Sequence, residues 1–135
     1  MAGPVAIYGP QDDVRLLLRS LLRLYKFEVA SEGARPNELR ALAPRPGTTV
    51  VLDVDLDEPE WTEAVQALRE AHPELRLLLI TPSRSARVDG QARSVGISAV
   101  LRRPFALRQL ADLMGVPPPP PAPPEPAVAE TGASG

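Results

Sequence analysis

The sequence of 135 residues contains no cysteine, a single histidine, His72, and a single lysine, Lys26. The absence of cysteine excludes disulfides, thiolate chemistry and cysteine-based zinc sites. One histidine leaves little room for Ser-His-Asp catalysis, and its position before Pro73, at an expected helix end, favours a solvated side chain. Aromatic residues make up only 4% of the chain and apolar residues 44%, which is typical of a globular protein.

The chain also lacks the run of about 18 apolar residues that a membrane span needs. Its first residues, Met-Ala-Gly-Pro, lack the basic flank and apolar stretch of a signal peptide. The 17 acidic residues include Glu125 and Glu130, so residues 1–116 carry 15 acidic and 15 basic residues. Because nucleic-acid-binding domains are usually basic, this balance argues against such a partner. We expect a cytoplasmic protein that binds neither membranes nor nucleic acid.

Proline is concentrated at the C-terminal end. Eight of the 17 prolines lie in the last 19 residues, five of them in a row at 117–121. Such a segment has too little apolar surface to offset the entropy of ordering it. We therefore expect one folded domain over residues 1–116 and an extended, disordered tail over 117–135. The tail could link to a further domain or bind a proline-recognising partner.

Short apolar runs alternate with helical patterns along the folded part, as in α/β proteins with a parallel sheet. The third and fourth runs are apolar without alternation, which is typical of central strands covered on both faces. The second run is interrupted by Glu28 and is expected at an edge. The expected strands span 5–8, 27–30, 48–53, 75–81 and 99–102. The expected helices span 14–25, 37–43, 57 or 58 to 71, 85–95 and 105–114.

The first of these helices has the clearest apolar face. Its expected core residues are Val14, Leu17, Leu18, Leu21, Leu22 and Tyr25. Five strands in strict alternation with five helices predict a flavodoxin-like doubly wound fold. This is a five-stranded parallel sheet of order 2-1-3-4-5 with helices on both faces. Its functional edge lies where strands one and three end.

Three anchors at the ends of the expected strands carry a family resemblance. Val50-Val51-Leu52-Asp53 ends the third strand, Thr81 ends the fourth, and Arg103-Pro104 follows the fifth. In order and spacing they resemble the receiver domain of bacterial two-component response regulators, the CheY-like family, over residues 5–114. The resemblance implies that Asp53 is the phosphoacceptor position. It also implies switch roles for the positions of Thr81, Val100 and Arg103.

The departures from the family pattern affect the same site. The acidic pair that helps to hold a divalent metal falls at Gly9 and Pro10, whose side chains cannot bind one. Arg103 stands in place of a lysine and could pair permanently with Asp53, because its guanidinium is larger and always charged. Val100 stands in place of the aromatic that reports the phosphorylated state. The chain therefore resembles a degenerate receiver, or pseudo-receiver.

The carboxylates near this edge have a second interpretation. A shifted alignment would place Asp12 and Asp13 at the metal pair, but the strand would then run through Pro10, which disfavours a buried ladder. In the first turn of a helix, both would instead stabilise the helix dipole. Together with Asp53 and Asp55, they could form a weak metal site.

Two surfaces are candidates for binding partners. The first helix carries a basic stripe of Arg15, Arg19 and Arg23 beside the apolar Leu16. In receivers this helix docks kinases and phosphotransfer proteins, so the resemblance implies a partner surface, with a solvated face as the alternative. Leu113 is expected off the core face of the last helix. The face of the fourth helix, fifth strand and fifth helix is a candidate for a homodimer.

These observations favour a signalling module that acts through protein contacts, without phosphorylation and without a cofactor. Its partner would be a histidine kinase, a phosphotransfer protein or a localisation protein. The alternative is a working phospho-receiver, with Asp53 as a Mg²⁺-dependent acceptor. An α/β enzyme acting on nucleotides or by hydrolysis is disfavoured, because no glycine-rich phosphate loop follows the first strand and no nucleophile–base pair is visible. We therefore expect no enzymatic activity.

Overall fold

The computed structural model describes residues 3–82, 86–103, 105 and 107–114 of the chain. Within them, strands and helices alternate strictly along the sequence. The strands are β1 (Pro4–Tyr8), β2 (Glu28–Gly33), β3 (Thr49–Leu52), β4 (Arg76–Thr81) and β5 (Ala99–Arg102). The helices are α1 (Asp12–Leu24), α2 (Pro36–Arg40), α3 (Pro59–Ala71), α4 (Ala86–Ser94) and α5 (Leu107–Leu113). The expected tail at 117–135 lies outside the described residues.

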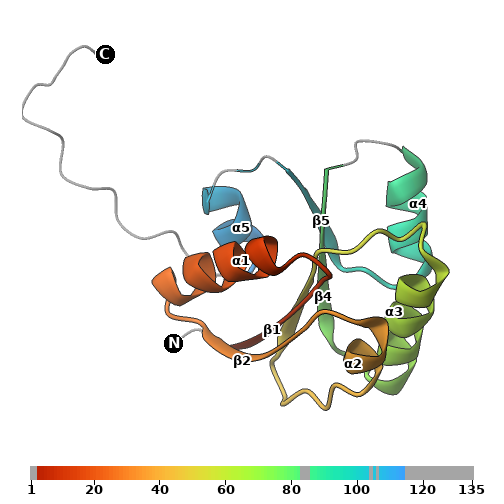
Figure 1. Cartoon of the computed structure of the whole chain (residues 1–135), viewed down its shortest axis with the longest axis horizontal. Coiled ribbons are helices and arrows are strands. Elements are labelled where there is room, and N and C mark those ends of the chain that lie inside the picture. Colours follow the sequence, from red (N-terminus) through yellow and green to blue (C-terminus); the bar gives the residue numbers. More distant parts are fainter. Residues whose placement is uncertain (1–2, 83–85, 104, 106, 115–135) are drawn as a thin grey trace, which may run out of the picture.

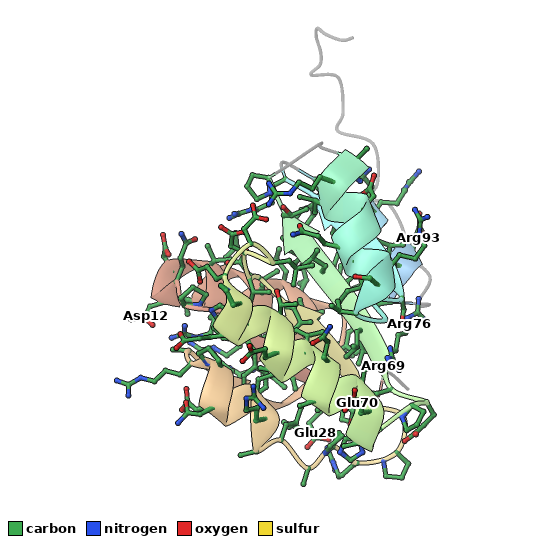
Figure 2. The ribbon with its side chains drawn as sticks, turned by 90° about the vertical axis from the view of Figure 1, so that its right-hand side faces the viewer. Asp12, Glu28, Arg69, Glu70, Arg76 and Arg93 are labelled. Atoms are coloured by element: carbon green, nitrogen blue, oxygen red, sulfur yellow. The ribbon has the colours of Figure 1, made fainter. Side chains whose placement is uncertain are left out.

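The strands form one parallel sheet of order β2-β1-β3-β4-β5. Figure 1 shows α1 and α5 on one side of the sheet and α2, α3 and α4 on the other. Figure 2, turned by 90°, shows the latter three helices in front of the strands. The predicted flavodoxin-like fold is therefore confirmed, with β2 at an edge as expected.

Each face of the sheet packs its own apolar layer. On β3, Val50 and Leu52 face α2, α3 and α4, whereas Val51 faces α1 and α5. Leu77 and Leu79 of β4 likewise lie on the first face, and Leu78 and Ile80 on the second. Because helices cover both faces, every residue of 50–52 and of 77–80 is buried, which explains the absence of polar alternation there.

Several element boundaries differ from those expected. β2 ends at Gly33 rather than at residue 30, because its register shifts between Val5 and Ala6 of β1 and pairing then continues to the end of that strand. α2 ends at Arg40, three residues before its expected end. α5 begins at Leu107, two residues after its expected start.

The expected core face of α1 is wrong at Leu17. Leu17 is 57% exposed, whereas Leu18 and Leu22 are each 1% exposed. Neighbouring helical residues point about 100° apart, so a stripe centred on Leu18 and Leu22 leaves Leu17 at its margin. Nothing packs over it from the described part of the chain. In that part, no helix is both long enough and apolar enough to cross a membrane.

Lys26, directly after α1, adopts a left-handed backbone conformation with φ of 68°. A residue with a Cβ atom is disfavoured there by about 1–2 kcal/mol, whereas glycine is not but loses more entropy on folding. We expect Lys26→Gly to stabilise the fold by about 0.5–1 kcal/mol and Lys26→Ala to change it by less than about 0.5 kcal/mol. Urea unfolding followed by fluorescence of the single tryptophan, buried Trp61, measures both. If Lys26→Gly and Lys26→Ala change the free energy of unfolding equally, the backbone conformation at position 26 does not cause the stabilisation.

Candidate functional site

The ends of β1, β3, β4 and β5 meet at one edge of the sheet. The ladder continues past the strands, since the Asp53 N–H donates to the Tyr8 carbonyl at 2.9 Å and the Arg103 N–H donates to the Thr81 carbonyl at 2.9 Å. These backbone bonds place Asp53, Thr81 and Arg103 around one pocket. The sequence had singled out all three.

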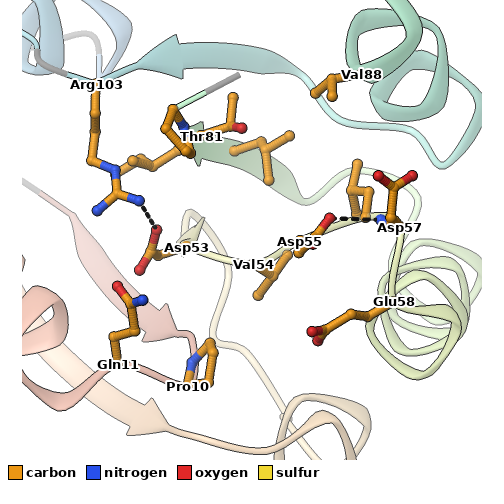
Figure 3. A pocket seen from close by; sticks show the side chains of 14 residues that line it. Pro10, Gln11, Asp53, Val54, Asp55, Asp57, Glu58, Thr81, Val88 and Arg103 are labelled. Carbon is orange, nitrogen blue, oxygen red and sulfur yellow. Dashed lines mark hydrogen bonds and ion pairs between the residues drawn. The ribbon is translucent and has the colours of Figure 1, made fainter. Parts of the chain in front are cut away.

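The pocket has a volume of about 460 Å³. Figure 3 shows Arg103 reaching toward Asp53 from one side, with Gln11 and Pro10 on the other. Asp55, Asp57 and Glu58 lie further along the pocket, toward α3. The remaining lining residues are Val54, Leu56, Leu79, Ile80, Thr81, Pro82 and Val88.

Asp53 and Arg103 form an ion pair at the floor of this pocket. One guanidinium nitrogen of Arg103 lies 3.6 Å from a carboxylate oxygen of Asp53, a separation longer than a hydrogen bond. The Asp53 side chain is only 6% exposed, while that of Arg103 is 33% exposed. The Nε atom of Arg103 is buried and has no hydrogen-bond partner within the described residues. Arg103 therefore attracts Asp53 without the close contact expected of a fully locked pair.

Burial raises the pKa of the Asp53 carboxyl above its ordinary value of 3.8. The positive charge of Arg103 opposes this rise, and the negative charge of Asp13 adds to it. Because the pKa remains raised, loss of hydration outweighs the attraction of Arg103. The ionised form of Asp53 is thus disfavoured by folding.

The residues at the metal-pair positions do not fit a divalent cation. Gly9 has no side chain, and the side chain of Pro10 has no oxygen to offer a metal. A Cβ atom at Gly9 would lie 2.5 Å from the backbone oxygen of Asp53. The space that an aspartate at position 9 would need is therefore filled by the backbone of Asp53, directly after β3.

The proposed weak metal site is also wrong in this structure. Among the residues that the structure describes, no three acidic or histidine side chains are grouped so that they could hold a metal ion. Asp12, Asp13, Asp53 and Asp55 therefore do not form one site. Asp12 pairs with Arg15 instead, and both Asp12 and Asp13 lie in the first turn of α1, as the dipole interpretation predicts.

The basic stripe on α1 is largely neutralised within the molecule. Arg15 contacts the Gly9 carbonyl, and its side chain is only 14% exposed. Arg19 pairs with Glu32 of β2 at 2.7 Å, and Glu32 also lies 4.0 Å from Arg15. Of the stripe, only Arg23 is exposed without an ion pair to a described residue. The stripe is therefore not the open cationic surface that its spacing indicated, although Leu16 is exposed.

One expectation on the face of α4, β5 and α5 also needs correction. Leu113, expected off the core face, is partly buried against the apolar layer beneath α1 and α5. Val100 packs against the opposite layer, outside the lining of the pocket, and its role as a switch position stays a prediction. Arg102 pairs with Asp89 of α4 within the same molecule, so this charge is not free to bind a partner.

Gln11 and Asp57 line the pocket at the edge where the sequence placed the ends of the first and third strands. The sequence did not indicate that Asp57 also links the far wall of the pocket to α4, by accepting bonds from Arg87 at 2.7 Å and Gln91 at 3.0 Å. No sequence pattern could indicate these contacts, because α4 follows Asp57 by about 30 residues and only the fold brings the two together.

Comparison with known proteins gives structural similarity without sequence similarity. No protein-family model matches the chain, and no curated protein sequence matches it. The structure of the Vibrio cholerae chemotaxis protein CheY4 is similar, with a TM-score of 0.73 and 19% identity, covering 85% of this chain and 98% of that one.

Two further solved structures are similar. A response regulator receiver domain protein from Clostridium thermocellum has a TM-score of 0.72 and 15% identity, covering 85% of this chain and 92% of its own. A LuxR-family DNA-binding response regulator from Staphylococcus aureus has a TM-score of 0.69 and 14% identity, covering 83% of this chain and 95% of its own. The chain thus has the fold of CheY-like receiver domains.

The close approach at Gly9 predicts a large effect of adding one methyl group. Gly9→Ala forces β1 away from β3 and should destabilise the fold by about 1–3 kcal/mol. Gly90→Ala is the matched control, since a Cβ atom at this α4 position has no neighbour within 4 Å. Because position 90 lies inside a helix, Gly90→Ala should stabilise the fold by about 0.5–1 kcal/mol. Urea midpoints of both variants test this, and a neutral Gly9→Ala would show that the contact relaxes freely.

The raised pKa of Asp53 predicts a pH-dependent effect of Asp53→Asn. A carboxyl whose pKa is raised by folding contributes its full stabilisation below pH 3.8, the ordinary pKa of the group. This stabilisation is lost as the pH rises through the pKa of the folded state. We expect Asp53→Asn to raise the denaturant midpoint at pH 7 and the gain to vanish below pH 3.8. Asp55→Asn, at an exposed position of the same loop, is the control. A lower midpoint for Asp53→Asn at pH 7 would mean that Arg103 outweighs burial.

Proposed function

We propose that the chain is a receiver-like signalling module that acts through contacts with other proteins, independently of phosphorylation. The observation that carries this proposal is the structure at Gly9 and Pro10. These positions offer no metal ligand, and the backbone of Asp53 closes the space at Gly9. The receiver fold supports a signalling role, and the altered site supports its independence from phosphorylation.

The chemistry of phosphoryl transfer explains why this site matters. A carboxylate that attacks a phosphoryl group brings negative charges together, and a bound divalent metal normally offsets their repulsion. Arg103 is the only basic side chain among the described residues that line this pocket. The guanidinium of Arg103, 3.6 Å from Asp53, carries one positive charge and therefore offsets this repulsion less than a divalent metal bound by carboxylates would. The proposal therefore includes no Mg²⁺ cofactor and no enzymatic activity.

The second candidate is a working phospho-receiver with Asp53 as the acceptor. It is favoured by the gathering of Asp53, Thr81 and Arg103 around one pocket, the three positions at which receivers carry acceptor, hydroxyl and cation. In that case Mg²⁺ would have to bind through Asp53 and backbone oxygens alone. The absence of an acidic pair makes this the weaker proposal.

The partner in our proposal is a cytoplasmic protein, such as a histidine kinase, a phosphotransfer protein or a localisation protein. The exposed leucines of α1 support that helix as the contact surface. A homodimer through α4, β5 and α5 stays a prediction. It is less well supported, because Arg102 and Asp89 pair within one molecule and Leu113 is partly buried.

Beryllofluoride with Mg²⁺ mimics a bound phosphoryl group and tests the proposal directly. We expect the backbone NMR signals of Asp53, Thr81 and Arg103 to stay unshifted at millimolar Mg²⁺, because no pair of side-chain ligands is present. The same titration of Asp53→Asn is the control for binding elsewhere. Saturable shifts at these three residues in the unmodified chain, absent from Asp53→Asn, would establish the phospho-receiver instead.

A further inference from the structure

The exposed large apolar side chains of the described residues all lie on α1. They are Leu16, Leu17 and Leu24, which are 53%, 57% and 61% exposed. Single exposed leucines are ordinary on protein surfaces, but three on one helix of 13 residues form a patch. Figure 1 shows that α1 lies on the outside of the molecule, beside α5. This patch is therefore open to a partner.

The middle of the patch is built for close approach. Leu16, Ser20 and Leu24 are spaced by four residues and form one ridge along the helix. The Ser20 hydroxyl donates to the Leu16 carbonyl at 2.9 Å, so its hydrogen is bonded within the helix. Covering Ser20 would leave no unsatisfied donor, and its small side chain lets a second helix come near.

The charges along α1 select the orientation of that second helix. Asp12 and Asp13 stand at its start, while Arg23 and Lys26 stand at its end. Within the described residues, Asp13, Arg23 and Lys26 take part in no ion pair. A parallel copy of α1 would bring like charges together, whereas an antiparallel copy brings each acidic end to a basic end.

We propose that α1 is a self-association surface, in which two copies of this chain pair their α1 helices antiparallel about a two-fold axis near Ser20. Leu16 and Leu17 of one copy then lie across from Leu24 of the other, and each contact occurs twice, as in other isologous dimers. This inference rests on the proposed function because it makes a second copy of this chain one of the proteins that bind the contact surface on α1. Self-association and the NMR signals of Asp53 are separate measurements, so either proposal can fail alone.

Sedimentation velocity of the full chain over a range of concentrations tests for the dimer. Leu24→Glu should raise the dissociation constant at least about tenfold, because the substitution acts twice in a symmetric interface. Gln66→Glu makes the same change of charge at an exposed position of α3 and should leave the constant unchanged. Circular dichroism checks that both variants fold, which is expected because both positions are exposed.

A charge exchange tests the antiparallel orientation. Asp13→Arg and Arg23→Asp should each weaken the dimer several-fold, since each places like charges at the meeting ends. The double variant restores opposite charges and should recover dimerisation. If the double variant is weaker than either single variant, the antiparallel arrangement is wrong.

The absence of cysteine provides a third test. With the axis near Ser20, mild oxidation of Ser20→Cys should link two chains, while Gln66→Cys should stay unlinked under the same conditions. A chain that remains monomeric at every concentration, with Ser20→Cys unlinked, would overturn the proposal. In that case another protein, or another part of this chain, covers the leucines of α1.

Discussion

The close contact between β1 and β3 at their carboxyl ends is the constraint on which the site depends. The Asp53 N–H donates to the Tyr8 carbonyl, and this extends the parallel ladder one residue past β3. The same pairing brings the Asp53 backbone oxygen so near to Gly9 that no side chain fits there. One backbone geometry thus holds Asp53 in the pocket and excludes an acidic side chain at position 9, directly after β1.

The electrostatics of the pocket follow from that exclusion. With no metal ligands on β1, the buried Asp53 carboxyl faces one cation, Arg103, at the end of β5. The ion pair is too long and the guanidinium too exposed to offset the loss of hydration, so the pKa of Asp53 stays raised. The pocket brings Asp53, Thr81 and Arg103 together, but it lacks the charge arrangement that would favour a second negative group beside Asp53.

The side chains on the surface of α1 differ in their availability to a partner: some arginines are bound within the molecule, while the leucines are exposed. Arg19 pairs with Glu32 of β2, whereas Arg15 contacts the Gly9 carbonyl and Asp12. Because of these contacts, most of the basic stripe is not available to a partner, whereas Leu16, Leu17 and Leu24 remain exposed on α1. Ion pairs within the molecule therefore decide which part of α1 a partner can use.

The sequence alone determined the alternation of strands and helices and the sheet order, and it placed Asp53 at the end of the third strand. Short apolar runs such as 50–52 that alternate with helical patterns favour strands covered by helices on both faces, and the residue types at Gly9 and Pro10 exclude side-chain metal ligands wherever the loop lies. Only the tertiary structure decided the exposure of Leu17, the pairing of Arg19 with Glu32 and the distance between Arg103 and Asp53. Periodicity indicates which face of a helix is apolar. The ion-pair partner of a charged side chain, however, lies on an element distant in the sequence, as Glu32 of β2 does for Arg19 of α1, and only the assembled sheet and its helices bring the two together.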